Sequence, residues 1–86
     1  MYKREAIVVD QQGMHARPAA KFVKIASQFK SDIVIEYNGK SINTKSIMGV
    51  LASGIKYNEK IMICAEGPDE KEAVEALINF LNHLNE

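Results

Sequence analysis

The sequence predicts an α+β fold in which helices pack on one face of an antiparallel sheet. Apolar and β-branched runs, helical spacing and turn residues predict four short strands and three helices in the order β-α-β-β-α-β-α. Two of these strand runs are joined by Asn38-Gly39, the dipeptide typical of a tight hairpin. The chain has 86 residues and contains no repeat, low-complexity tract or linker, which predicts a single domain over residues 1–86.

The N-terminal part of the chain predicts a strand, a turn and a helix. The strand is expected over Lys3–Val9 because of its β-branched run, and the polar turn Asp10-Gln11-Gln12-Gly13 follows it. A helix is expected from Ala16 to about Gln28. Its apolar residues recur at intervals of three and four, which predicts a core-facing stripe of Ala16, Ala19, Ala20, Val23 and Ala26, widened by Phe22, Ile25 and Phe29.

The middle of the chain predicts a hairpin and a short helix. Ile33–Tyr37 has strand composition, and the Asn38-Gly39 pair after it suits a type I′ turn. A second strand is therefore expected to return over Lys40–Thr44. Ser46 is expected to cap a two-turn helix that runs to Ser53, with Gly54 as the left-handed residue that ends it.

The C-terminal part predicts a buried strand and a long helix. Lys60–Glu66 is apolar on both faces, which indicates a central strand that needs cover from helices. Gly67-Pro68 interrupts the chain, and Asp69 with Glu72 matches the capping-box pattern at a helix start. The helical spacing then continues through Val74, Leu77, Ile78, Leu81 and Leu84.

Composition excludes several classes of function. Eleven basic and eleven acidic residues give a formal net charge of zero, so no global positive field favours nucleic acid as a direct partner. The single cysteine, Cys64, has no internal disulfide partner and lies in an apolar run, which is typical of a buried thiol in a reducing cytoplasm. The early charges of the N-terminus and the lack of an apolar run of about 18 residues predict neither export nor membrane insertion.

The stretch Gly13-Met14-His15-Ala16-Arg17-Pro18 places one histidine directly before a helix. The N–H groups of Ala16 and Arg17 would have no partner inside the helix, and the positive end of the helix dipole attracts anions. Such a position suits a phosphoryl group on His15, and the Arg17 guanidinium could hold two phosphate oxygens. The spacing alone favours an ordinary surface or core histidine over phosphoryl chemistry.

The residues 13–19, Gly-Met-His-Ala-Arg-Pro-Ala, resemble the active-site motif of the HPr family, the histidine phosphocarriers of the bacterial phosphoenolpyruvate-dependent sugar phosphotransferase system. Lys45–Val50 resembles the regulatory serine segment of HPr proteins from low-GC Gram-positive bacteria. The resemblance covers essentially the whole chain. It implies an open-faced β-sandwich with strand order 1-4-2-3 and three helices on one face, acting as a cytoplasmic, monomeric carrier rather than an enzyme and without a cofactor.

The resemblance also implies a reaction and its partners. Enzyme I, charged by phosphoenolpyruvate, would place a phosphoryl group on Nδ1 of His15, and His15 would pass it to the IIA domains of sugar permeases. Arg17 and the amides of Ala16 and Arg17 would stabilise the phosphate. Ser46 would be phosphorylated by HPr kinase/phosphorylase, and the product would bind a catabolite-control repressor in carbon catabolite repression.

The short helix also supplies a candidate docking patch. Ile47, Met48 and Leu51 share one side of it, and the resemblance favours a partner surface, although their periodicity is equally compatible with core packing. Lys24 and Lys45 would rim this patch and meet acidic partners, or would simply be solvated. Ala20 is a further expected contact; many relatives have a threonine there, which bears on partner preference.

Two other classes of function remain open on the sequence. One is a regulatory adaptor that works through Ser46 alone; the regulatory Crh proteins resemble HPr but lack the histidine, so the presence of His15 argues against assigning the chain to them. The other is a small hydrolase with His15 as general base, but no nucleophile or orienting carboxylate neighbours His15. His83 stands alone in the last helix, without metal-ligand spacing, and is expected at the surface.

Overall fold

The structure is a computed structural model of the chain that describes residues 1–9 and 12–83. The predicted turn residues Asp10 and Gln11, and the predicted helix residue Leu84, lie outside the described residues. The elements, in chain order, are β1 (Tyr2–Ile7), α1 (Ala16–Ala26), β2 (Asp32–Tyr37), β3 (Lys40–Asn43), α2 (Ile47–Leu51), β4 (Lys60–Glu66) and α3 (Glu70–Asn82). This order confirms the predicted β-α-β-β-α-β-α arrangement.

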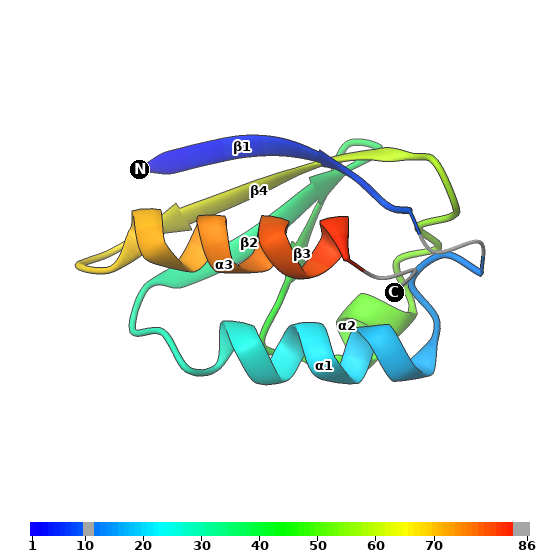
Figure 1. The fold of residues 1–86 in the computed structure, drawn as a ribbon, viewed down its shortest axis with the longest axis horizontal. Coiled ribbons are helices and arrows are strands. Elements are labelled where there is room, and N and C mark those ends of the chain that lie inside the picture. The colour runs from blue at the N-terminus through cyan, green and yellow to red at the C-terminus, as the bar shows by residue number, and fades with distance from the viewer. Residues whose placement is uncertain (10–11, 84–86) are drawn as a thin grey trace.

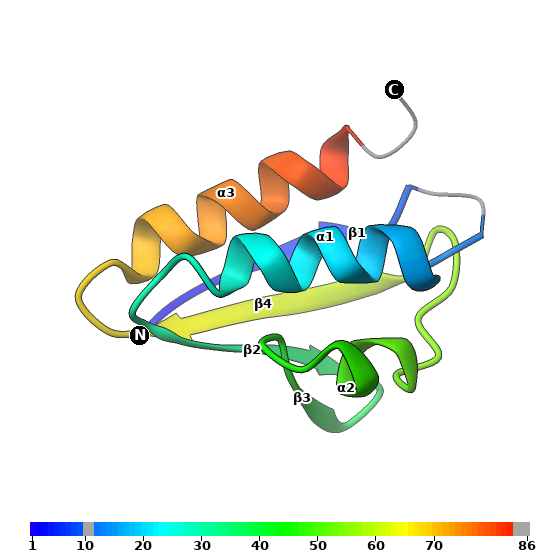
Figure 2. The ribbon, with the colours of Figure 1, turned by 90° about the horizontal axis from the view of Figure 1, so that it is seen from below.

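The four strands form one sheet in the order β1-β4-β2-β3, and every neighbouring pair is antiparallel. The three helices lie on the same face of this sheet (Figures 1 and 2). The predicted open-faced α+β sandwich and its strand order 1-4-2-3 are therefore confirmed. In the β2–β3 turn, Asn38 and Gly39 both have positive φ, 53° and 79°, as the type I′ hairpin requires.

The core lies between the sheet and the helices. Alternate residues of each strand point toward the helices, because successive side chains in a strand lie on opposite faces. Ile35 on β2 and Ile63 on β4 are opposite each other in the register and fully buried, and they meet Phe22 of α1 and Leu77 of α3 in one apolar cluster. Burying each such side chain contributes about 1.5–3 kcal/mol to folding.

The buried stripe of α1 differs from the predicted one. Ala19, Phe22, Val23 and Ala26 are buried, whereas Ala16 and Ala20 are exposed. At 100° per residue, the bulky Phe22 turns the buried stripe away from Ala16 and Ala20. The helix therefore presents Ala20 to solvent.

Strand β4 is central, as predicted, but helices cover only one of its faces. On the other face Cys64 lies opposite Lys3 of β1 and Val34 of β2, and it is only 3% exposed. Burial raises the pKa of its thiol, because the thiolate would lose hydration there. Cys64 is thus the free, buried thiol expected from the sequence.

Two predicted helix ends require correction. Helix α2 ends at Leu51 with Ala52 as its C-cap, so Gly54, although its φ is +76°, lies beyond the end it was expected to form. Asp69 makes no capping hydrogen bond to α3. Its carboxylate instead accepts the N–H groups of Lys30 and Ser31, at 2.9 Å each, and the Ser31 hydroxyl.

Candidate functional site

His15 is the N-cap residue of α1, with extended backbone angles of φ −83° and ψ −172°. Its carbonyl oxygen accepts the N–H of Ala19 at 3.0 Å, which begins the helical hydrogen bonding. Its side chain makes no capping bond to the helix and is half-buried. The imidazole is therefore attached at the positive end of an eleven-residue helix, the position the motif predicted.

The loop before His15 rests on the backbone of residues 55 and 56. Gly13 has φ +70°, and a Cβ there would lie 2.6 Å from Ile55 O and 2.9 Å from Lys56 Cα. Only glycine fits so close an approach. The N–H of Met14 donates to Ile55 O at 3.1 Å, and the Met14 and Ile55 side chains are both buried. The segment before β4 runs beside the segment that enters α1 in both views (Figures 1 and 2).

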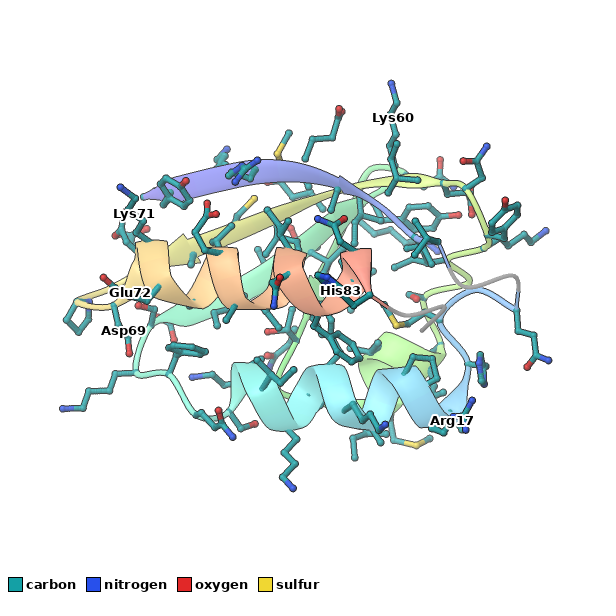
Figure 3. All side chains as sticks on the ribbon, viewed as in Figure 1. Arg17, Lys60, Asp69, Lys71, Glu72 and His83 are labelled. Carbon is teal, nitrogen blue, oxygen red and sulfur yellow. The ribbon has the colours of Figure 1, made fainter. Side chains whose placement is uncertain are left out.

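Arg17 occupies the first turn of α1 and is exposed at the end of the molecule where that helix begins (Figure 3). Pro18 follows it in the same turn, where a helix tolerates a missing N–H. The N–H groups of Ala16 and Arg17 have no acceptor inside the helix, because they precede its first full turn. An anion on His15 could thus meet two backbone donors and a guanidinium.

Helix α2 packs against α1 and begins at Ser46, as predicted. The Ser46 hydroxyl oxygen accepts the N–H of Gly49 at 3.1 Å, which is the expected N-cap bond. The Ser46 side chain is half-buried and therefore still accessible in part.

The apolar residues of α2 point mostly outward. Ile47, Met48 and Leu51 are 45%, 75% and 38% exposed, so they are not core residues, an alternative that their periodicity had left open. Only Val50 of this helix is buried. Exposed methionine and isoleucine on a small protein are typical of an interaction surface.

The cations expected around this patch are exposed as well. Lys24 and Ala20 are both exposed on α1. Lys45 is exposed, and its Nζ donates to Phe29 O at 2.9 Å, which leaves further N–H donors for other acceptors. The segments 12–31 and 37–58, which carry His15 and α2, contain no Asp or Glu. Their charged residues are all basic: Arg17, Lys21, Lys24, Lys30, Lys40, Lys45 and Lys56.

Within residues 1–9 and 12–83, no three His, Cys, Asp or Glu side chains are grouped so that they could hold a metal ion. His83, the C-cap of α3, is exposed, and its Nδ1 lies 2.7 Å from Asn79 O. None of the helices described is long and apolar enough to span a membrane.

Comparison with known proteins gives one consistent result. Residues 2–83 match the family model described as PTS HPr component phosphorylation site. HPr-C-His from Thermoanaerobacter tengcongensis is 40% identical, with a TM-score of 0.92 over 95% of this chain and 92% of that one. The phosphocarrier protein HPr of Bacillus anthracis is 42% identical, with a TM-score of 0.89 over 93% of this chain and 95% of that one.

The regulatory relative Crh of Bacillus subtilis, which forms a domain-swapped dimer, is also similar. It is 38% identical, with a TM-score of 0.77 over 95% of this chain and 94% of that one. The family match spans nearly the whole chain, and it includes the histidine that caps α1. This chain therefore belongs to the HPr family of phosphocarriers of the phosphotransferase system.

Proposed function

We propose that this chain carries a phosphoryl group on His15, taken from enzyme I and given to IIA domains of sugar permeases. The position of His15 as N-cap of α1 carries the proposal. The lone pair of Nδ1 would form a new N–P bond while the N–P bond to the phosphohistidine of enzyme I breaks. The amides of Ala16 and Arg17 and the Arg17 guanidinium would stabilise the charge in both directions of transfer.

The carrier would dock through the exposed residues of α2 and α1. Ile47, Met48 and Leu51 offer an apolar contact, Ala20 extends it on α1, and Lys24 and Lys45 would face acidic groups of the partner. We propose a cytoplasmic monomer that turns over no substrate of its own. The molar mass in solution tests the monomer, since Crh shows that the same fold can exchange a segment between copies.

Incubation with enzyme I and phosphoenolpyruvate, followed by intact mass spectrometry, tests the carrier function. We expect one phosphoryl group, lost in acid as the N–P bond of a phosphohistidine should be. His15→Ala should abolish it, and the matched control His83→Ala should keep it. Labelling that persists in His15→Ala would refute the proposal.

A second function, regulation through Ser46, has its own support. Ser46 is accessible at the start of α2, and the regulatory relative Crh is 38% identical to this chain. A phosphate on Ser46 would lie at the positive end of this helix, which favours it locally. We propose that HPr kinase/phosphorylase modifies Ser46 and that the product binds a catabolite-control repressor. Phosphorylation by purified kinase and ATP should be lost in Ser46→Ala, and retention would exclude this serine.

A further inference from the structure

The peptide group between Ile55 and Lys56 is held from both of its sides. Its carbonyl oxygen, on Ile55, accepts the N–H of Met14 at 3.1 Å. Its N–H, on Lys56, donates to Oε1 of Glu59 at 2.7 Å. The C=O and N–H of one peptide are coplanar, so a rotation that breaks one of these hydrogen bonds also displaces the other. The Glu59 carboxylate thus fixes the direction in which Ile55 O meets the loop before His15.

Glu59 is itself held in place by the last residue of β2 and by a residue just after β1. The hydroxyl of Tyr37, the last residue of β2, donates to Oε1 of Glu59 at 2.5 Å. The backbone of Glu59 accepts the N–H of Val8, just after β1, at 3.1 Å. The hydrogen bonds from Tyr37 and from the Lys56 N–H lower the pKa of the Glu59 carboxyl, which therefore remains ionised at neutral pH. A charged acceptor makes both hydrogen bonds stronger than a neutral one would.

The loop before His15 packs tightly against the Ile55–Lys56 peptide. The backbone of Gly13 touches Ile55 and Lys56 so closely that no side chain fits between them. A displacement of the Ile55–Lys56 peptide must therefore move Met14, and with it the next residue, His15. Group transfer is sensitive to such movements, since a misplacement of 1 Å can cost about a hundredfold in rate.

We propose that Glu59, anchored by Tyr37, is a positioning residue for His15, acting through the Ile55–Lys56 peptide and the N–H of Met14. The inference rests on the proposed function of His15 as phosphoryl acceptor. Glu59 lies outside the docking patch, and its carboxylate accepts hydrogen bonds from the Tyr37 hydroxyl and the Lys56 N–H. It acts on the angle at which His15 is presented, and therefore on the transfer step rather than on partner binding.

The test uses near-isosteric variants and matched controls. Glu59→Gln keeps the shape and removes the charge, and Tyr37→Phe removes the hydroxyl alone. Glu72→Gln on the exposed face of α3 and Tyr57→Phe in the same loop segment are the controls. Phosphorylation by enzyme I is followed in rapid-quench experiments at increasing enzyme I concentration, and thermal unfolding by circular dichroism checks that each variant folds.

At saturating enzyme I, we expect the transfer rate to fall about tenfold for Glu59→Gln and roughly threefold for Tyr37→Phe. The apparent KM and the controls should stay at wild-type values. A merely structural role would lower the melting temperature and leave the saturated rate of the folded protein unchanged. An unchanged saturated rate, or a change confined to KM, would overturn the inference.

Amide hydrogen exchange of Met14 tests the contact without any phosphate. Its protection should drop in Glu59→Gln and remain in Glu72→Gln, and equal protection in both would also overturn the inference. The exchange measurement separates the positioning role of Glu59 from the carrier function of His15. A wild-type protein that accepts no phosphoryl group would refute the carrier function, while a Glu59-dependent Met14 amide would still support the positioning contact.

Discussion

His15 and His83 have the same side chain, but one lies at the start of a helix and the other at the end of a different helix. His15 is the N-cap of α1, where N–H groups point outward, whereas His83 is the C-cap of α3, where carbonyl groups do. The negative end of a helix dipole repels an anion, so a phosphoryl group on His83 would be destabilised. The position, rather than the ring, therefore selects the phosphorylated residue.

Arg17 is expected to act on the phosphate and not on the fold. Its side chain is exposed, so replacement by alanine should leave the melting temperature unchanged. Loss of the bidentate guanidinium should slow transfer from enzyme I by about tenfold, equivalent to ~1.4 kcal/mol of transition-state stabilisation. Single-turnover rates, with Lys21→Ala as the exposed control on the same helix, measure this. A large drop in melting temperature would instead assign Arg17 a structural role.

At the scale of elements, Asp69 joins two segments that are distant in sequence. Lys30 and Ser31 lie between α1 and β2, and Asp69 directly precedes α3. The Asp69 carboxylate accepts their backbone N–H groups and so ties the two segments together. Figure 3 shows Asp69 at the end of the molecule opposite Arg17. The Ser31 hydroxyl, followed by the two backbone N–H groups, lowers the pKa of the Asp69 carboxyl.

The Asp69 contact should make stability depend on pH. The folded pKa lies below the unfolded value of about 3.9, so the stabilisation is complete above that value and is lost as pH falls through the folded pKa. Asp69→Asn should melt at a lower temperature than wild type at neutral pH, and the difference should shrink in acid. Melting curves against pH, with the exposed Asp32→Asn as control, measure it. A difference that stays constant into acid would contradict the expectation.

The same residue shows what a local pattern can predict. Apolar patterning, together with the Asn38-Gly39 turn and the Ser46 cap, correctly located all seven elements, because these signals are local to each element. The Asp69 and Glu72 spacing matched a capping box, but the partners of Asp69 are 38 and 39 residues away and leave no local signal. Likewise, the periodicity of α2 could not decide whether Ile47 and Met48 face the core or the solvent.

At the scale of the whole molecule, the fold brings together segments that the sequence separates. The pattern predicted helices on one face of a sheet, whereas the strand order came from the family resemblance, since periodicity carries no order. The motif predicted His15 and Arg17 at the start of a helix. The hydrogen bond between Tyr37 and Glu59, which we propose supports the loop before His15, joins residues 22 positions apart and had no signal in the sequence.

The packing of α1 against α2 also places the two proposed sites on neighbouring helices. A phosphate on Ser46 would add between one and two negative charges at pH 7, directly beside Ile47 and Met48. A partner that covers this patch would have to desolvate that charge against an apolar or acidic surface. Phosphorylation of Ser46 should therefore hinder docking of enzyme I. The domain should stay folded, because an anion at the start of α2 is locally favourable.

Ser46→Asp should reproduce part of this block. Aspartate is a good N-cap, so the variant keeps the capping bond to Gly49 while placing a negative charge at the patch. We expect a large rise in the apparent KM for enzyme I, up to about a hundredfold if ~2.7 kcal/mol of complex stability is lost, with little change at saturation. Ser46→Ala, which loses the cap without adding charge, is the control and should keep the wild-type KM. Transfer rates at increasing enzyme I concentration distinguish the outcomes. An unchanged KM in Ser46→Asp would leave Ser46 as a helix cap alone. A fall in the saturated rate would indicate a disturbed His15 loop rather than blocked docking.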